Sequence, residues 1–71
     1  MDEDDRRDLV ARMFALLTGK FEDGAAIAAD GQGRDIADVI RTGLAERLRA
    51  IGGEIAILAE AATLLCGREP R

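Results

Sequence analysis

The segment GQGRDI at residues 31–36 is the first place where residue types and spacing suggest chemistry. Gly31 and Gly33 match the first two glycines of the dinucleotide-binding fingerprint, a tight turn whose backbone amides hold a pyrophosphate. Ile36 stands where the third glycine should be, and the residues before the segment have a helical rather than a strand pattern. The fingerprint works only between a strand and a helix, so we interpret the segment as a loop that ends a helix.

The acidic residues raise the question of a metal site. Counted as an EF-hand loop from Asp30, the segment would place Arg34 at a ligand position, which is incompatible with a hard cation. Di-metal helical bundles pair glutamates with Glu-x-x-His motifs, but the sequence has no histidine. We therefore expect no metal and no other cofactor, and interpret five carboxylates that could meet across a bundle as a solvated acidic surface: Glu22, Asp23, Asp30, Glu54 and Glu60.

Nucleophiles are scarce, since three threonines and Cys66 are the only hydroxyl or thiol side chains. A reactive thiol needs a helix N-terminus or a nearby cation or base, and Cys66 falls at the end of a predicted helix instead. Without histidine the usual activated triad cannot be assembled. We expect Cys66 to be a small packing residue and the chain alone not to be an enzyme.

One basic cluster, formed by Arg41, Arg47 and Arg49, could bind an acidic peptide or a phosphate. We favour ion pairs with Glu46, Glu54 or the acidic N-terminus, and the sequence leaves open whether the cluster binds anything else. The net charge of −4, from 14 acidic and 10 basic residues, argues against nucleic acid and anionic membranes as partners. No apolar run approaches the roughly 20 residues of a membrane span, and we expect a cytoplasmic protein.

A chain of 71 residues forms one domain, residues 1–71, and buries too little surface to be very stable alone. Its single cysteine excludes a disulfide within the chain, so we expect the additional stability to come from association with another chain. The composition, 48% hydrophobic and 34% charged, is typical of an ordered chain. Abundant alanine, glycine and arginine also suggest a GC-rich bacterial genome.

The first predicted helix covers about residues 5–30, and Gly31 or Gly33 should end it in the left-handed conformation. Met13 lies at the edge of its apolar face, which comprises Val10, Phe14, Leu17, Phe21, Gly24 and Ala28. A second row on the same helix comprises Leu9, Leu16 and Ile27.

The second predicted helix covers about residues 35–66, with Asp35 as its N-cap and Asp38 in its first turn. Its heptad pattern is an a/d seam of Leu44, Leu48, Ile51, Ile55, Leu58, Ala62 and Leu65. The spacing continues through Gly52 and Gly53, which predicts an unbroken helix. Small residues occupy the position beside the seam (Ala45, Gly52, Ala59 and Cys66), and three residues should stop the helix: Gly67, Arg68 and Pro70.

These elements predict an all-α fold, an antiparallel two-helix hairpin with a loop at about residues 31–34. Because each helix carries more apolar surface than the other can cover, we expect two hairpins to pair into a homodimeric four-helix bundle. The candidate interface residues are Leu44, Leu48, Ile51, Ile55, Leu58, Leu65, Val39, Ile57 and Leu64.

The expected function is that of a small non-catalytic interaction or regulatory protein, acting through homo-oligomerisation and a protein partner. Two alternatives are an accessory subunit of a larger enzyme or secretion complex, and a small-molecule binder with a pocket between the helices near Gly24 and Gly52. The identity of any partner or ligand, the biological process and the docking direction of the hairpins are open at this level.

Overall fold

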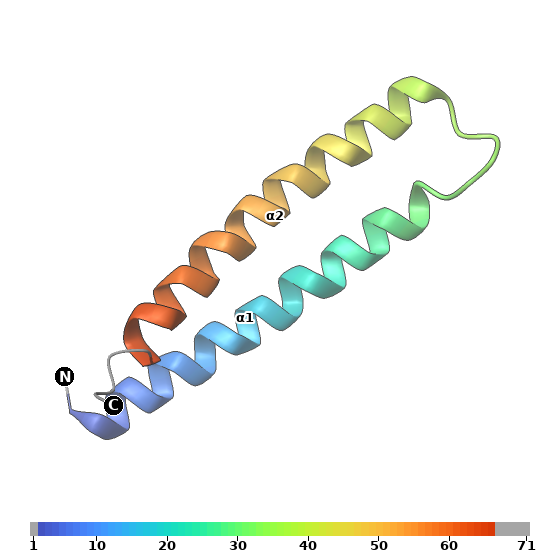
Figure 1. Ribbon diagram of the computed structural model, residues 1–71. Coiled ribbons are helices and arrows are strands. Elements are labelled where there is room, and N and C mark those ends of the chain that lie inside the picture. Colours follow the sequence, from blue (N-terminus) through green and yellow to red (C-terminus); the bar gives the residue numbers. More distant parts are fainter. Residues whose placement is uncertain (1, 67–71) are drawn as a thin grey trace.

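The computed structural model describes residues 2–66, which form two antiparallel helices, α1 (Glu3–Asp30) and α2 (Asp38–Cys66), as Figure 1 shows. The part of the chain that the structure describes contains no strand. The start of α1 and the end of α2 lie at one end of a molecule measuring 52 × 18 × 17 Å, and the connecting loop lies at the other. The predicted all-α hairpin is confirmed.

The N-terminus of α1 is fixed by its acidic residues. Asp2 is the N-cap, and its carboxylate accepts a hydrogen bond from the backbone N–H of Asp5 at 2.8 Å. Glu3, Asp4 and Asp5 occupy the first turn, where negative charge faces the positive end of the helix. The carboxylate of Asp2 satisfies a backbone donor that would otherwise lack a partner, so α1 begins two residues earlier than predicted.

The loop between the helices covers residues 31–37 and is longer than predicted. Gly31 has φ −74°, and no glycine of the described residues has a positive φ, so the expected left-handed glycine was wrong. The Asp35 cap was also wrong, because α2 begins at Asp38. The side chain of Ile36 folds back so closely on Gly33 that a Cβ there would lie 2.8 Å from it. Residues up to Ile36 are thus used in closing the loop, and α2 starts after them.

Arg41 holds this loop against the first turn of α2. Its guanidinium donates to the carbonyl oxygen of Gly31 at 3.2 Å and to that of Gly33. Both carbonyls belong to the end of α1 or the turn after it, where backbone acceptors have no helical partner. Arg41 lies seven residues before the seam residue Leu48, so it occupies a position that is apolar in the rest of the seam. Its side chain stabilises the chain reversal instead.

Helix α2 runs unbroken through Gly52 and Gly53, as the heptad spacing predicts. The seam residues are half-buried or, in the case of Ala62, buried, whereas Val39, Ile57 and Leu64 are exposed. The heptad prediction for α2 is confirmed. The predicted helix stop at Gly67, Arg68 and Pro70 lies outside the described residues.

The contact face of α1 is rotated from the predicted one. Phe14, Phe21 and Ala28, which were expected in the core, are exposed. Met13, expected at the edge, and Ile27, expected in the second row, are buried. The residues that face α2 recur every three or four positions and are Val10, Met13, Leu17, Lys20, Gly24 and Ile27.

The rotated face accommodates Lys20. Two sets of positions on α1 have the same heptad spacing and share Val10, Leu17 and Gly24, and they differ at three places: Met13, Lys20 and Ile27 in one set, and Phe14, Phe21 and Ala28 in the other. The set with Lys20 makes the contact, and its ammonium leaves the seam and reaches Glu54 Oε1 on α2 at 2.6 Å. The aliphatic stem of Lys20 can then pack along the seam while its charge is compensated outside it.

The core of the hairpin is thin. Among the described residues only Met13, Leu17, Ile27 and Ala62 are buried, and no large side chain is fully enclosed. The accessible surface is 5610 Å². A folded monomer of 7.6 kDa is expected to expose about 4,300 Å². The hairpin therefore leaves about 1,300 Å² more surface in water than a compact chain of its mass.

Ile55 and Glu60 allow the seam of α2 to be tested. Ile55→Ala should lower the free energy of unfolding by about 2 kcal/mol, the low end of the range for a truncated aliphatic, since Ile55 is half-buried. Glu60→Ala, at an exposed position of the same helix, should change it by no more than about 0.5 kcal/mol. Denaturant melts of both variants at one protein concentration make the comparison, and equal losses would show that the seam is misplaced.

Candidate functional site

The exposed aromatic residues lie on one side of the hairpin, which we call the phenylalanine face. Phe14 and Phe21 are 55% and 60% exposed and stand beside the α1 seam. Helical spacing places both rings on one side of α1. The small residues that flank the α2 seam lie on the same side, because Phe14 lines a hollow together with Ala59 and Cys66. The face comprises Ala11, Phe14, Thr18, Phe21, Ala25 and Ala28 of α1 with Ala45, Arg49, Gly52, Ala56, Ala59, Thr63 and Cys66 of α2.

The phenylalanine face is almost free of charge, although 34% of the chain's residues are charged. Arg49 is its single ionic side chain over residues 11–28 and 45–66, and the same helical positions carry charges only at the helix starts, at Asp4, Arg7 and Asp38. The hydroxyls of Thr18 and Thr63 donate to the carbonyl oxygens of Phe14 and Ala59 in their own helices, at 3.1 and 2.9 Å. Each threonine thus has its donor satisfied internally, which leaves the face without an unmet hydroxyl donor.

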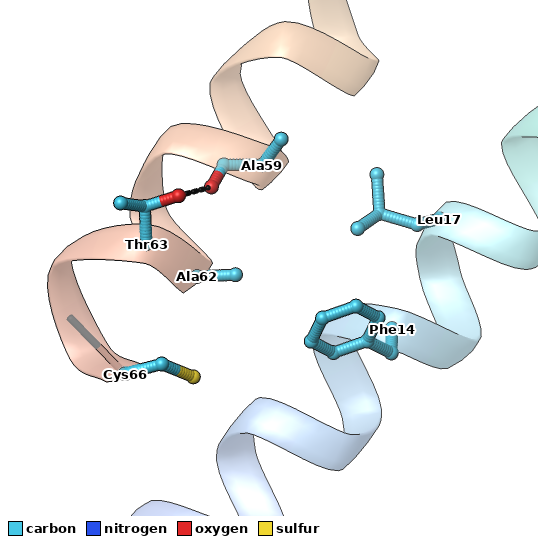
Figure 2. Close-up of a pocket in the computed structure, with 6 residues that line it drawn as sticks. All are labelled: Phe14, Leu17, Ala59, Ala62, Thr63 and Cys66. Atoms are coloured by element: carbon cyan, nitrogen blue, oxygen red, sulfur yellow. Dashed lines mark hydrogen bonds between the residues drawn. The ribbon is translucent and has the colours of Figure 1, made fainter.

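A hollow of about 230 Å³ opens on this face near the helix termini. Figure 2 shows Phe14 and Leu17 of α1 on one side of it and the small side chains of α2 on the other. Its lining residues are Phe14, Leu17, Ala59, Ala62, Thr63 and Cys66. Because α2 contributes only small side chains here, the two helices leave a gap beside the phenyl ring.

The opposite side of the hairpin is divided. Leu16, Ile40, Ile57 and Leu64 are exposed there, and the register of the helices puts Leu16 level with Ile57. Nearer the loop the same side is charged, with the Lys20–Glu54 ion pair crossing between the helices. The charged residues of this side are Arg12, Asp23, Asp30, Arg47 and Glu54.

The predicted interface residues divide between the two kinds of surface. Six of them, Leu44, Leu48, Ile51, Ile55, Leu58 and Leu65, are half-buried in the seam against α1. Val39, Ile57 and Leu64 are exposed and available to another molecule. Whether any of the nine lies in an interface stays a prediction.

The basic cluster does not act as one unit. Arg41 binds the loop carbonyls and lies 3.8 Å from Asp38, whereas Arg47 and Arg49 make no ion pair within residues 2–66. Glu54, one of the predicted partners, pairs with Lys20 instead. At the termini, Arg6 bonds to Glu3 and donates to the carbonyl oxygen of Leu65 at 2.9 Å, which ties the start of α1 to the end of α2.

One carboxyl group and one ammonium group have pKa values that differ from their ordinary values. The hydrogen bond from Arg6, with the charges of Arg6 and Arg7, holds the pKa of Glu3 below 4.5. The hydrogen bond to Glu54 and its charge raise the pKa of Lys20 above 10.5. Both groups are at the surface and are engaged in ion pairs, so neither shift indicates an acid or base for catalysis.

The remaining chemical candidates find no supporting geometry in the described residues. Residues 31–36 follow a helix, as the loop interpretation expects, and not the strand that the dinucleotide fingerprint requires. Within residues 2–66, no group of three or more His, Cys, Asp or Glu side chains is placed to hold a metal ion. Neither of the described helices is long and apolar enough to cross a membrane.

The phenylalanine face was missed at the level of sequence, because Phe14 and Phe21 were assigned to the core of the hairpin. A signal for it was present: the positions that flank both seams on this side carry a single charge over residues 11–28 and 45–66. Comparison with protein-family models, curated proteins and solved structures found no match.

The single lysine of the sequence provides a direct test of the register of the helices. Glu54→Gln should lower the pKa of Lys20 toward 10.5, because the charged partner of its ammonium is lost. A raised pKa means that the folded state favours the charged form of Lys20. The ion pair therefore contributes stability at pH values below the ordinary pKa of lysine, and this contribution should be lost as the pH rises through the pKa of the folded state. NMR titration of the Lys20 side chain measures the pKa, with Glu60→Gln as the control that leaves it unchanged. A pKa insensitive to Glu54→Gln would contradict the register.

Proposed function

We propose that this chain is a small helical interaction protein of the cytoplasm that self-associates into a four-helix bundle and presents helix surfaces to a protein partner. The observation that carries the proposal is the surplus of exposed apolar side chains over buried ones. Only four described residues form the core. Seven large hydrophobic residues are exposed: Phe14, Leu16, Phe21, Val39, Ile40, Ile57 and Leu64.

The amount of exposed surface supports association. A standard protein interface buries about 800 Å² on each partner. The excess of about 1,300 Å² over a compact monomer is larger than that, so the chain exposes enough additional surface for one dimer interface.

A small-molecule binder is less well supported. The hollow beside Phe14 has a volume of about 230 Å³ and lies at the end of the hairpin away from Gly24 and Gly52. Ligand pockets usually enclose about 300–1,000 Å³ and place a few polar groups among apolar walls. The hollow has one polar side chain, Thr63, whose hydroxyl already donates to Ala59.

Sedimentation equilibrium tests the proposal. At micromolar concentration we expect a mass of twice the 7.6 kDa of one chain, because two hairpins remove more apolar surface from water than one. A mass of one chain throughout the accessible concentration range would contradict self-association.

A further inference from the structure

We infer that the phenylalanine face is the surface on which a second copy of this chain docks, with α1 of each copy lying on α2 of the other and both loops at the same end. This inference rests on the proposed self-association and specifies which surface performs it and in which direction the hairpins dock.

The distribution of charge selects this face. Over residues 11–28 and 45–66, docking through it would remove one ionic side chain per copy, Arg49, from full contact with water, and the long stem of that residue can carry its charge to the edge. Docking through the opposite side over the same residues would bring in four charged residues, Arg12, Asp23, Arg47 and Glu54, together with Lys20, the partner of Glu54. Desolvating charges costs free energy that only well-placed partners offset, so the phenylalanine face is favoured.

The shapes of the two helices select the orientation. On this face α1 contributes the large apolar side chains, Phe14 and Phe21, while α2 contributes alanine, glycine, threonine and cysteine apart from Arg49. A large side chain packs against a small one and clashes with another large one, so α1 should lie on α2 of the second copy.

The hollow and Gly52 are the places that receive the two rings. A dry cavity of about 150 Å³ already accommodates benzene, so the hollow of about 230 Å³ has room for a phenyl ring. The register of the hairpin places Phe14 level with Ala59, and Phe21 level with Gly52, where a Cβ would have no atom within 4 Å. The second copy's Phe14 would enter the hollow and the second copy's Phe21 would lie on Gly52.

Symmetry then fixes the direction of docking. A twofold axis parallel to the helices places α1 on α2 of the second copy and leaves both loops at one end. A twofold axis across the hairpin would place α1 on α1 instead, bringing the phenylalanine-bearing helices together. With the parallel axis every helix has antiparallel neighbours only, as in common four-helix bundles.

Distances between the two loops test the orientation. A nitroxide label is attached at Gln32→Cys in the exposed loop, with Cys66→Ser removing the native thiol by a change of nearly equal size. Loops at the same end should give a distance of roughly 15–30 Å by pulsed electron resonance, since neighbouring helices lie about 8–10 Å apart. Loops at opposite ends should give a distance near the 52 Å length of the hairpin, which would overturn the inference.

The adjacent glycines of α2 give a matched pair of variants that tests the face itself. Gly52→Leu should raise the dissociation constant of the dimer about tenfold or more, because it fills the space for the second copy's Phe21. Gly53→Leu, at the outermost position, should leave the constant within about twofold. Both substitutions replace a mid-helix glycine by a better helix former, so loss of folding cannot explain a difference.

A second pair of variants tests the face by shortening a side chain rather than by adding one. Phe21→Ala should weaken the dimer, whereas Ile57→Ala on the opposite side should not, although both residues are exposed in the hairpin. A dimer weakened by Ile57→Ala and insensitive to both Gly52→Leu and Phe21→Ala would overturn this inference and leave the proposed function standing. A wild-type chain that stays monomeric would overturn both.

Discussion

A pair of antiparallel helices covers one narrow stripe on each member, and here that limit leaves seven large apolar side chains exposed to water. The seam between α1 and α2 takes up Met13, Leu17 and Ile27 on one helix and half-buries the leucines and isoleucines of the other. Nothing in a two-helix hairpin can then cover the residues that flank the seam. The cap at Asp2, the loop held by Arg41 and the terminal hydrogen bonds of Arg6 position the seam, but they add no buried apolar area.

The Lys20–Glu54 pair lets a stripe of α1 that contains a lysine be the one covered within the chain. If Phe21 were to face α2, Lys20 would point outward and the phenylalanines would be buried in the hairpin core. With Lys20 in the seam and its ammonium at Glu54, the rings are left on the outside, next to the small residues of α2. The same helix then has two apolar stripes, one for its own chain and one for another, which is what each helix of a four-helix bundle requires.

Much of the fold could be predicted from the sequence. Both helices, their antiparallel arrangement and the unbroken course through Gly52 and Gly53 follow from heptad spacing, which is strong in α2 because one set of positions is apolar throughout from Leu44 to Leu65. The rotation of α1 could not be predicted, since two sets of positions have the same spacing, and the partner that compensates Lys20 in the seam, Glu54, lies on the other helix. The start of α2 was missed for a related reason. Asp35 resembles a cap locally, while the contacts of Ile36 and Arg41 with Gly33 are made across the loop.

We propose that folding and self-association of this hairpin are coupled, because the surface beside the seam is apolar and nothing within the hairpin covers it. The most direct measurement is the thermal unfolding midpoint of the wild-type chain over a hundredfold range of protein concentration. A coupled dimer of this size should melt about 3–6 °C higher for each tenfold increase in concentration. A midpoint that stays constant over the whole range would contradict the account, because it would mean that the hairpin unfolds as a single chain.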